Sequence, residues 1–373
     1  MNLKSNIKAK FIKLKSLIQL NKNEIFFLNN IKKTKSTKKK VANICVNMIA
    51  DYYHLIYLHF LINETKIDPN SIVAIWPYNI YGVNPKKNNL ISIWRFKFFS
   101  YFEKKKWKKL YSSLGIKNFE DLESNNLFVN IFFFYKVFYI VKKNYFSSIK
   151  KILKFTYKKI RIGDLVVDTY IRFRYVPSLT RKDFFFKFIL FKSFISIYKL
   201  EKIFYKNKIS KHFLSYVSYV QNGIPARFSL QKKIESISLY SNTSYNKKLS
   251  INDCTHIENL KYFKHNFAKI KNKNKALRNS SAILKNKFLG KNNHAMPYLK
   301  KSPYGNKRKK LIYEQSLEGV LFLHDFFDST TIYRPFVFEG YYEWAIYTLD
   351  LIEKYNLNIA VKPHPNSLKE NQI

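Results

Sequence analysis

Short apolar runs alternate with an amphipathic stretch near the C-terminal end of the chain. Val320–Leu323 is a continuous apolar run, which predicts a strand buried on both faces of a parallel sheet. Tyr341–Tyr355 carries apolar residues at helical spacing with charged residues on its other side, and Leu357–Val361 is a second apolar run. Strand, helix and strand in this order predict a right-handed βαβ unit whose strands end on the same edge.

A similar alternation opens the earlier part of the chain. Val41–Ile49 predicts the first strand of a Rossmann-like domain, and Asp51 is placed to cap the following helix, Tyr52–Ile62. A strand at Ser71–Trp76 comes next, after a turn. Further on, Leu110–Leu122 predicts a helix that stops at a glycine and a new helix that begins after it.

A second strand–helix–strand pattern lies in the middle of the chain. The run Lys211–Val220 predicts a strand, which Gly223 and Pro225 punctuate before the helix Ala226–Ile234 and the strand Ser236–Tyr240. No Gly-x-Gly-x-x-Gly motif follows the first strand of the chain, so the sequence lacks a dinucleotide fingerprint. The pattern as a whole predicts an α/β fold.

These patterns divide the chain into a basic leader at 1–40, a Rossmann-like domain at 41–312 and the opening of a second Rossmann-like domain at 313–373. The leader suits a loosely ordered arm better than an amphipathic anchor on a membrane surface. The presumed second domain spans only 61 residues (313–373), and two strands with one helix cannot cover both faces of a sheet. We therefore expect this end to be poorly packed.

The two most apolar stretches are Leu127–Val141 and Phe184–Tyr198, and lysines interrupt both. Each falls short of the roughly 18–20 uninterrupted apolar residues of a membrane span, so we expect buried helices or strands, with peripheral membrane contact as a second interpretation. Cys45 and Cys254 suggest neither a disulfide framework nor a cysteine-based metal site. With no secretory signal, these features favour the cytoplasm, including the inner face of the plasma membrane.

The net charge of +44 narrows the choice of partners less than its size suggests. Of the 68 basic residues only 9 are Arg, and a Lys- and Asn-rich chain also follows from AT-biased coding. Proteins that bind nucleic acid favour Arg, whose planar fork matches phosphate and guanine. No specific nucleic-acid partner is expected. An anionic membrane surface or a phosphate-bearing substrate fits the charge.

Candidate chemistry follows the two C-terminal strands. His324 and Asp325 come directly after the first strand, and Lys362 and His364 follow the second, so parallel strands would bring them to one edge, where ligands bind in open α/β folds. His364 would donate to a phosphate, or would be a turn residue between two prolines. His324 would be a general base that Asp325 orients, or Asp325 would brace the loop. A metal pair is disfavoured because this His-Asp ends a strand.

Five further residues are candidates. Asp164, Asp168 and Arg172 would share one face of a helix, where an ion pair or contact with substrate would explain them equally well. Arg227 falls in the first turn of a predicted helix, near N–H groups that bind anions. Arg334, between the two C-terminal strands, is placed to reach a phosphate or to face solvent.

Three blocks of sequence near the C-terminal end, FLHDFFDS at 322–329, FEGYYEW at 338–344 and VKPHPN at 361–366, resemble bacterial capsule and surface-polysaccharide biosynthesis proteins. The Gly-Asp…Asp-x-Tyr-x-Arg block at 163–172 and the segment Tyr219–Arg227 resemble the same family. Its members are similar to GT-B glycosyltransferases, which pair two Rossmann-like domains.

The resemblance implies transfer of a sugar from a nucleotide-activated donor to a polysaccharide or lipid-linked acceptor, without an obligatory metal and without a cofactor. The nucleotide-binding half of a GT-B enzyme needs on the order of 100 residues or more, so the resemblance also implies that the chain is incomplete as a catalyst. His324 or Asp168 would be the base, and Lys362, His364 and Arg334 would supply positive charge to the leaving diphosphate. Two other classes stay open: a basic nucleic-acid-binding protein and a non-catalytic scaffold on a membrane surface.

Overall fold

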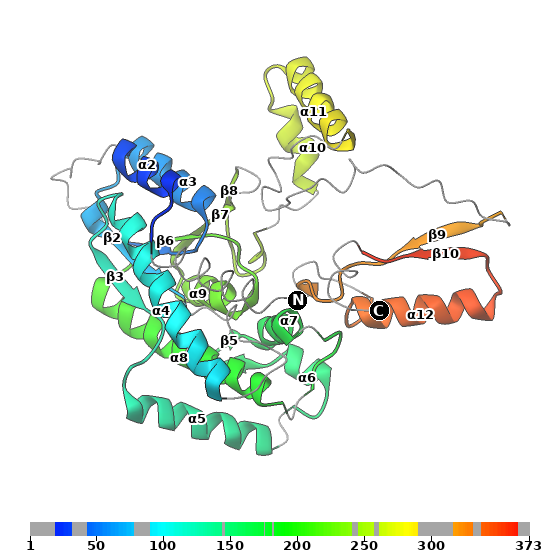
Figure 1. Cartoon of the computed structure of the whole chain (residues 1–373), viewed down its shortest axis with the longest axis horizontal. Coiled ribbons are helices and arrows are strands. Elements are labelled where there is room, and N and C mark those ends of the chain that lie inside the picture. The colour runs from blue at the N-terminus through cyan, green and yellow to red at the C-terminus, as the bar shows by residue number, and fades with distance from the viewer. Residues whose placement is uncertain are drawn as a thin grey trace, which may run out of the picture. The chain divides into compact units, whose positions relative to one another are not determined.

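The computed structural model describes residues 19–31, 43–77, 90–143, 146–174, 176–180, 183–240, 245–256, 261–289, 316–330 and 337–364 (Figure 1). It divides into two compact units, and each is described by itself. Unit 1 comprises 1–241, 245–256 and 327–334. Unit 2 comprises 242–244, 257–326 and 335–373. The sequence had placed a single boundary at 312/313.

Unit 1 is built around a six-stranded sheet with the order β3-β2-β1-β6-β7-β8. Its strands are β1 (Ile44–Asn47), β2 (Ile72–Trp76), β3 (Asn118–Asp121), β6 (Lys211–Leu214), β7 (Glu235–Tyr240) and β8 (Tyr245–Lys248). Neighbouring strands are parallel except for β7 and β8, which are antiparallel. A mixed α/β fold with a mainly parallel sheet, compatible with a Rossmann-like domain, is thereby confirmed.

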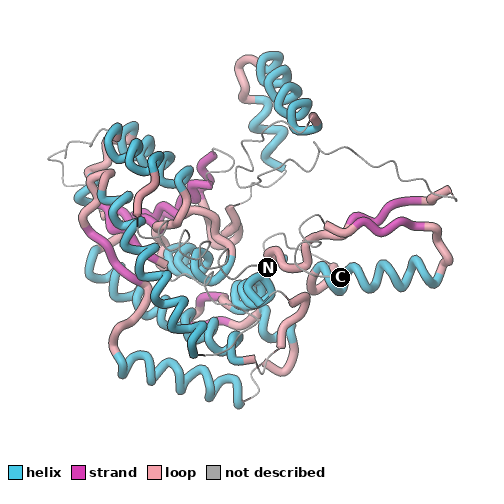
Figure 2. The backbone as a smooth tube through the Cα atoms, viewed as in Figure 1, coloured by secondary structure: helices cyan, strands magenta, loops and turns pink. Residues whose placement is uncertain are grey.

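Helices cover both faces of this sheet (Figure 2). They are α2 (Lys22–Asn30), α3 (Tyr52–Glu64), α4 (Leu90–Ser112), α5 (Leu127–Lys142), α6 (Ile149–Leu153), α7 (Gly163–Arg174), α8 (Phe184–Asn207) and α9 (Tyr219–Gln231). A 3₁₀ turn at Pro69–Ser71 precedes β2, and a small hairpin, β4 (Thr156–Tyr157) and β5 (Ile160–Arg161), precedes α7. Side chains alternate along each strand: Cys45 packs into one hydrophobic cluster, whereas Ile44 and Val46 pack into the other.

Part of the predicted basic leader belongs to this core. Asn21 and Glu24 form a capping box at the start of α2, and Phe27 packs against the second hydrophobic cluster. The Glu24 carboxylate is 2% exposed and pairs with Lys106 at 2.5 Å. The residues before 19 and those at 32–42 lie outside the described part of the chain.

Two local predictions in unit 1 were wrong. The predicted strand Lys211–Val220 is a strand only to Leu214, and α9 already begins at Tyr219, so Gly223 and Pro225 lie inside a helix. The reason is tertiary: Gly223 lets α9 approach α7 so closely that a Cβ there would lie 2.5 Å from Leu165.

The new helix predicted within Leu110–Leu122 is a strand. α4 ends at Ser112, Gly115 turns the chain at a φ of +89°, and β3 follows. β3 pairs in parallel with β2 at the edge of the sheet, a long-range pairing that overrides the local helical pattern.

The two most apolar stretches differ in their burial. Both form helices, but α8 is largely buried, whereas in α5 only Phe133 and Val137 are buried, contrary to the expectation that both would be interior. Among the described residues, none of the helices has the length and apolar character required to cross a membrane.

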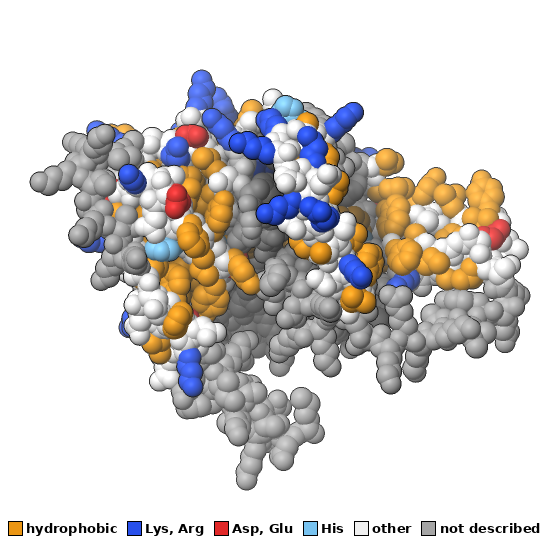
Figure 3. Space-filling model, turned by 90° about the horizontal axis from the view of Figure 1, so that it is seen from above, with side chains coloured by type: hydrophobic (Ala, Val, Ile, Leu, Met, Phe, Trp, Pro, Cys, Tyr) orange, Lys and Arg blue, Asp and Glu red, His pale blue; other side chains and the backbone are white. Residues whose placement is uncertain are grey.

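Unit 2 contains the predicted C-terminal βαβ unit. β9 (Gly319–Phe322) and β10 (Ile359–Lys362) pair in parallel and α12 (Tyr341–Lys354) connects them, as expected. The same unit holds α10 (Lys261–Ala268) and α11 (Lys273–Phe288). The strands are not buried on both faces, because Val320 is 46% and Phe322 64% exposed. Hydrophobic side chains accordingly reach the surface over β9 and β10 (Figure 3).

Gly163 and Gly223 lie so close to neighbouring atoms that replacing either by alanine should destabilise unit 1. In Gly163→Ala the new Cβ would lie 1.6 Å from the Ile152 carbonyl oxygen, so backbone must move. In Gly223→Ala it would lie 2.5 Å from a Leu165 methyl group and 2.9 Å from the Val217 carbonyl oxygen, which is a smaller overlap. We expect Gly163→Ala to destabilise unit 1 by about 3 kcal/mol or more and Gly223→Ala by about 1–2 kcal/mol. Urea unfolding followed by circular dichroism measures both. The exposed Lys232→Ala is the control and should change stability by less than about 0.5 kcal/mol; equal losses for all three would contradict the packing described.

Candidate functional site

The first cluster of predicted site residues lies on α7 and α9 in unit 1. Asp164 is 3% exposed and is held by Arg227 through two contacts, Nη1 to Oδ1 at 2.5 Å and Nη2 to Oδ2 at 2.9 Å. Arg161 also donates to this carboxylate, at 2.7 Å. Arg227 donates further to the carbonyl oxygen of Arg161, at 2.6 Å. The guanidinium of Arg227 therefore ties α9 to the start of α7.

Electrostatics keep this pair charged. Burial acts to raise the pKa of Asp164, but the adjacent Arg227 and Arg161 outweigh it and leave the pKa below its ordinary value. Arg227 is not in a first helical turn as predicted, because α9 begins at Tyr219. Its role in phosphate binding stays a prediction, and the contacts observed are those of a bidentate structural ion pair.

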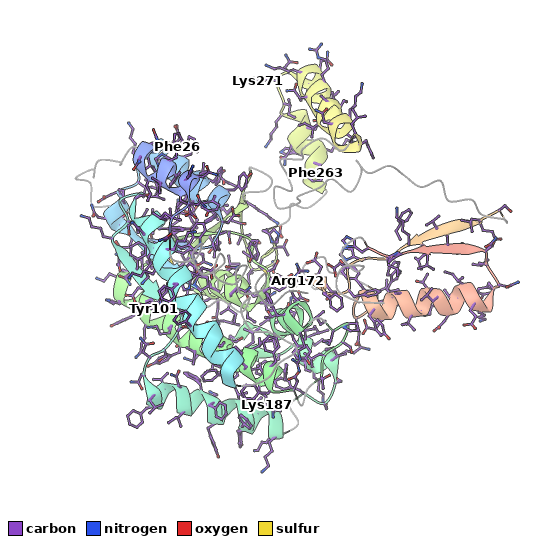
Figure 4. The ribbon with its side chains drawn as sticks, viewed as in Figure 1. Phe26, Tyr101, Arg172, Lys187, Phe263 and Lys271 are labelled. Carbon is purple, nitrogen blue, oxygen red and sulfur yellow. The ribbon has the colours of Figure 1, made fainter. Side chains whose placement is uncertain are left out.

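Asp168, the alternative base, is 1% exposed and accepts a hydrogen bond from Thr330 Oγ1 at 3.2 Å. A second contact of the same kind joins Tyr219 Oη to Asp328 Oδ1, at 3.2 Å. The short segment 327–330, which the sequence places beside β9, thus returns to unit 1 and packs on α7 and α9. Arg172 lies on α7 as well (Figure 4).

The start of α9 lies at the point where the order of the sheet reverses, since β1 pairs with β2 on one side and with β6 on the other. In open α/β sheets this is where ligands bind. Gln221 and Asn222 follow there, 3% and 1% exposed, with amide atoms that have no hydrogen-bond partner within the described residues. Sequence reasoning missed both, because a polar residue gives no local sign that it will be buried.

Two buried histidines near this edge are unsuited to acid–base chemistry. His256 accepts from the Val217 N–H at 3.3 Å, and burial, reinforced by Lys247, lowers its pKa to about 4. His212 on β6 contacts Ser229 at 2.6 Å and Asn47 at 2.9 Å, and burial lowers its pKa to about 3. Both rings are therefore neutral at physiological pH and hold neighbouring elements together.

The second cluster lies in unit 2, where β9 and β10 end. The ring of His324 stacks on Tyr341 with centroids 3.9 Å apart, and its centroid is 6.0 Å from that of His364. The parallel register pairs Phe322 with Lys362, so the residues that follow both strands leave the sheet together. The expectation that His324 and His364 share one edge is confirmed. We name His324, Tyr341, Lys362 and His364 the histidine cluster.

Hydrogen bonding defines the tautomer of His324. Its Nδ1 lies 3.0 Å from the main-chain carbonyl oxygen of Asp325, which can only accept, so Nδ1 carries the hydrogen and Nε2 of the neutral ring has the lone pair. This contact orients the ring through the backbone of Asp325, whereas the sequence had suggested its carboxylate. Asp325 is buried, at 7% exposure. In this tautomer Nε2 is the ring nitrogen that carries the lone pair.

Lys362 remains at the surface, with Nζ 5.4 Å from the centroid of the Phe322 ring. Arg334 lies outside the described residues, so its predicted contact with phosphate stays a prediction. Within the ranges that the structure describes, no group of three or more His, Cys, Asp or Glu side chains is placed to hold a metal ion. The histidine cluster thus combines one accessible cation with two imidazoles and an aromatic ring.

The ion pair of unit 1 makes a quantitative prediction. Asp164→Asn or Arg227→Met leaves a buried charge without its main partner and should cost about 3–5 kcal/mol at pH 7, whereas Arg161→Met, at a side chain 57% exposed, should cost about 1 kcal/mol or less. The double variant Asp164→Asn with Arg227→Met should lose much less than the sum of the two single losses.

The contribution of Asp164 to the stability of unit 1 should depend on pH. Because the folded pKa of Asp164 is lowered, its stabilisation is present in full above the ordinary aspartate value of about 3.9 and is lost as the pH falls below it. The stability difference between the wild type and Asp164→Asn should therefore shrink only in acid. A difference that already shrinks between pH 7 and 5 would contradict the assignment.

Comparison with models of known protein families, with curated proteins and with solved structures gives no match to this chain. The geometry of these two clusters is therefore the basis for a functional proposal.

Proposed function

We propose that this chain is a glycosyltransferase-like protein of surface-polysaccharide biosynthesis, in which unit 2 binds the diphosphate of a nucleotide-activated sugar. The observation that carries the proposal is the histidine cluster at the carboxyl edge of two parallel strands. There His324 and His364 lie 6.0 Å apart, centroid to centroid, beside the exposed Lys362. Ligand phosphates commonly bind at such an edge. The mainly parallel sheet of unit 1 is compatible with the first domain of a GT-B pair.

The residues have separate roles in the proposed reaction. The hydroxyl oxygen of the acceptor forms a bond to the anomeric carbon of the sugar and passes its proton to Nε2 of His324. The bond between that carbon and the phosphate oxygen breaks, and its electron pair leaves with the diphosphate. Lys362 and His364 stabilise the negative charge that develops there.

Asp168 is the weaker candidate for the base. It is 1% exposed and accepts a hydrogen bond from Thr330, whereas His324 is only partly buried and shares a unit with Lys362 and His364. A base must reach the proton that it removes. We therefore assign the base to His324 and a positioning role to Asp168.

Binding of diphosphates tests the histidine cluster. The 373-residue chain should bind uridine or guanosine diphosphate weakly, with a Kd on the order of 1 mM, because few cationic groups contribute. Lys362→Ala should weaken binding about tenfold, since it removes a charge-assisted hydrogen bond. Phosphorus NMR titration measures this. The exposed Lys354→Ala on α12 is the matched control, and a Lys362→Ala variant that binds as well as Lys354→Ala would remove the phosphate site from this edge.

Sugar transfer tests the assignment of the base. Incorporation of label from a set of radioactive nucleotide sugars into a lipid extract should fall about 100-fold or more in His324→Ala, because general-base catalysis contributes about 10²–10⁴-fold. Asp350→Asn, at an exposed position on α12, should leave the rate unchanged. Transfer that survives in His324→Ala but is lost in a folded Asp168→Asn variant would reverse the assignment.

A further inference from the structure

The helix α5 in unit 1 is apolar on the side that faces solvent. Of its 16 residues only Phe133 and Val137 are buried. On the opposite side Phe128 is 82%, Tyr135 72% and Phe132 59% exposed. Phe128 and Tyr135 are seven residues apart, two turns along the helix, so they lie on one line. We name this line and its flanking apolar residues the outer face of α5; the flanking residues are Leu127, Ile131, Phe134, Phe138 and Tyr139.

A helix in this position ordinarily has a polar outer side, because water covers it. Here no residue of the outer face is acidic, and the strongly polar side chains of the helix are limited to Asn130, Lys136 and Lys142. Such helices are buried in protein or in lipid. Because α5 is too short to span a bilayer, cover by lipid would require the helix to lie along the membrane surface with its outer face inserted.

Lysines gather at the C-terminal end of this face. Lys142 and Lys143 are exposed, and Lys187 of α8 reaches the same place (Figure 4). A pocket of about 660 Å³ lies among them, lined by Tyr135, Phe138, Tyr139 and these three lysines, with other residues.

Two of these lysines place their ammonium groups over aromatic rings. Lys187 Nζ lies 4.7 Å from the Phe138 centroid, and Lys143 Nζ lies 4.8 Å from that of Tyr139. Both contacts are cation–π interactions. Lysines beside exposed aromatic rings also suit a membrane interface, where the rings lie among the headgroups and the ammonium groups stay near phosphate.

Charge decides between the two occupants that would cover an apolar face of this size. A second copy of the chain would bring the same lysines and another net charge of +44 to the interface, which opposes close association. An anionic lipid surface offers acyl chains to the aromatic side chains and phosphate to the lysines. The complementarity favours the lipid.

We propose that the outer face of α5 binds the surface of an anionic membrane, with its aromatic residues inserted among the headgroups and Lys142, Lys143 and Lys187 in contact with lipid phosphate. This places unit 1 at a membrane and holds whether or not the chain transfers a sugar.

Vesicle flotation with the full chain tests the proposal. The wild type should float with vesicles of equal parts phosphatidylglycerol and phosphatidylcholine, and much less with pure phosphatidylcholine. The triple variant Phe128→Ser, Phe132→Ser, Tyr135→Ser should bind on the order of 100-fold less at every salt concentration, because it removes apolar area. The variant Lys142→Gln, Lys143→Gln, Lys187→Gln should bind on the order of 100-fold less and show a weaker salt dependence, because it removes three cations from the proposed contact with lipid phosphate.

Matched controls come from other parts of unit 1. Tyr205→Ser removes a ring that is 89% exposed on α8, and Lys206→Gln with Lys248→Gln removes two lysines whose side chains are 72% and 75% exposed. Both should leave flotation unchanged, apart from a small effect of net charge. Because the serine positions are exposed, circular dichroism of the triple variant should match that of the wild type.

Quenching by lipid locates the helix directly. Emission from a tryptophan introduced as Tyr135→Trp should be quenched by brominated phosphatidylglycerol, and emission from Tyr205→Trp should not. The proposal is overturned if the wild type binds neither kind of vesicle, or if the two tryptophans are quenched equally. It is also overturned if sedimentation shows self-association that the triple serine variant abolishes without any change in flotation.

Discussion

The parallel pairing of β1 with β6 holds the central sheet of unit 1 together, because β2 and β3 lie on one side of it and β7 and β8 on the other. Its interior includes a buried imidazole: His212 bridges Asn47 on β1 and Ser229 on α9. The ring satisfies polar atoms that would otherwise be buried alone, at the cost of remaining uncharged. This contact helps to fix the position of α9 against the sheet.

Several residues that the sequence suggested as part of a functional site make structural contacts instead. Gly163 admits the carbonyl of Ile152 at the start of α7, and Asp164 connects that start to Arg227 on α9. The Gly-Asp pair is thus explained by close packing and an ion pair. The histidine cluster is different. His324 stacks on Tyr341 without tying together two buried elements, and Lys362 is exposed. This contrast is why the proposed chemistry rests on unit 2.

The sequence predicted the features that neighbouring residues determine, and it did not predict contacts between residues far apart in the chain. Apolar runs and one cap were local, so β1, β2 and the βαβ unit were predicted, and Asp51 does accept from Tyr53 N–H, at 2.8 Å. The proximity of His324 and His364 followed from the parallel topology. The Asp164–Arg227 pair joins residues 63 apart, and Asp168–Thr330 residues 162 apart, so no local pattern could reveal them. The exposure of α5 was not predicted, because the hydropathy of a stretch does not show whether its apolar side chains face the core or the solvent.

The return of segment 327–330 to unit 1 has a consequence for the order of folding. The chain leaves unit 1 after residue 256 and re-enters it at 327, so a loop of about 70 residues must close before Phe327 and Thr330 can be buried. Closing a flexible loop of that length costs on the order of 4 kcal/mol in chain entropy. During synthesis, Asp168 and Tyr219 must wait for partners that emerge more than a hundred residues later. This segment should therefore be the last part of unit 1 to form and the first to open.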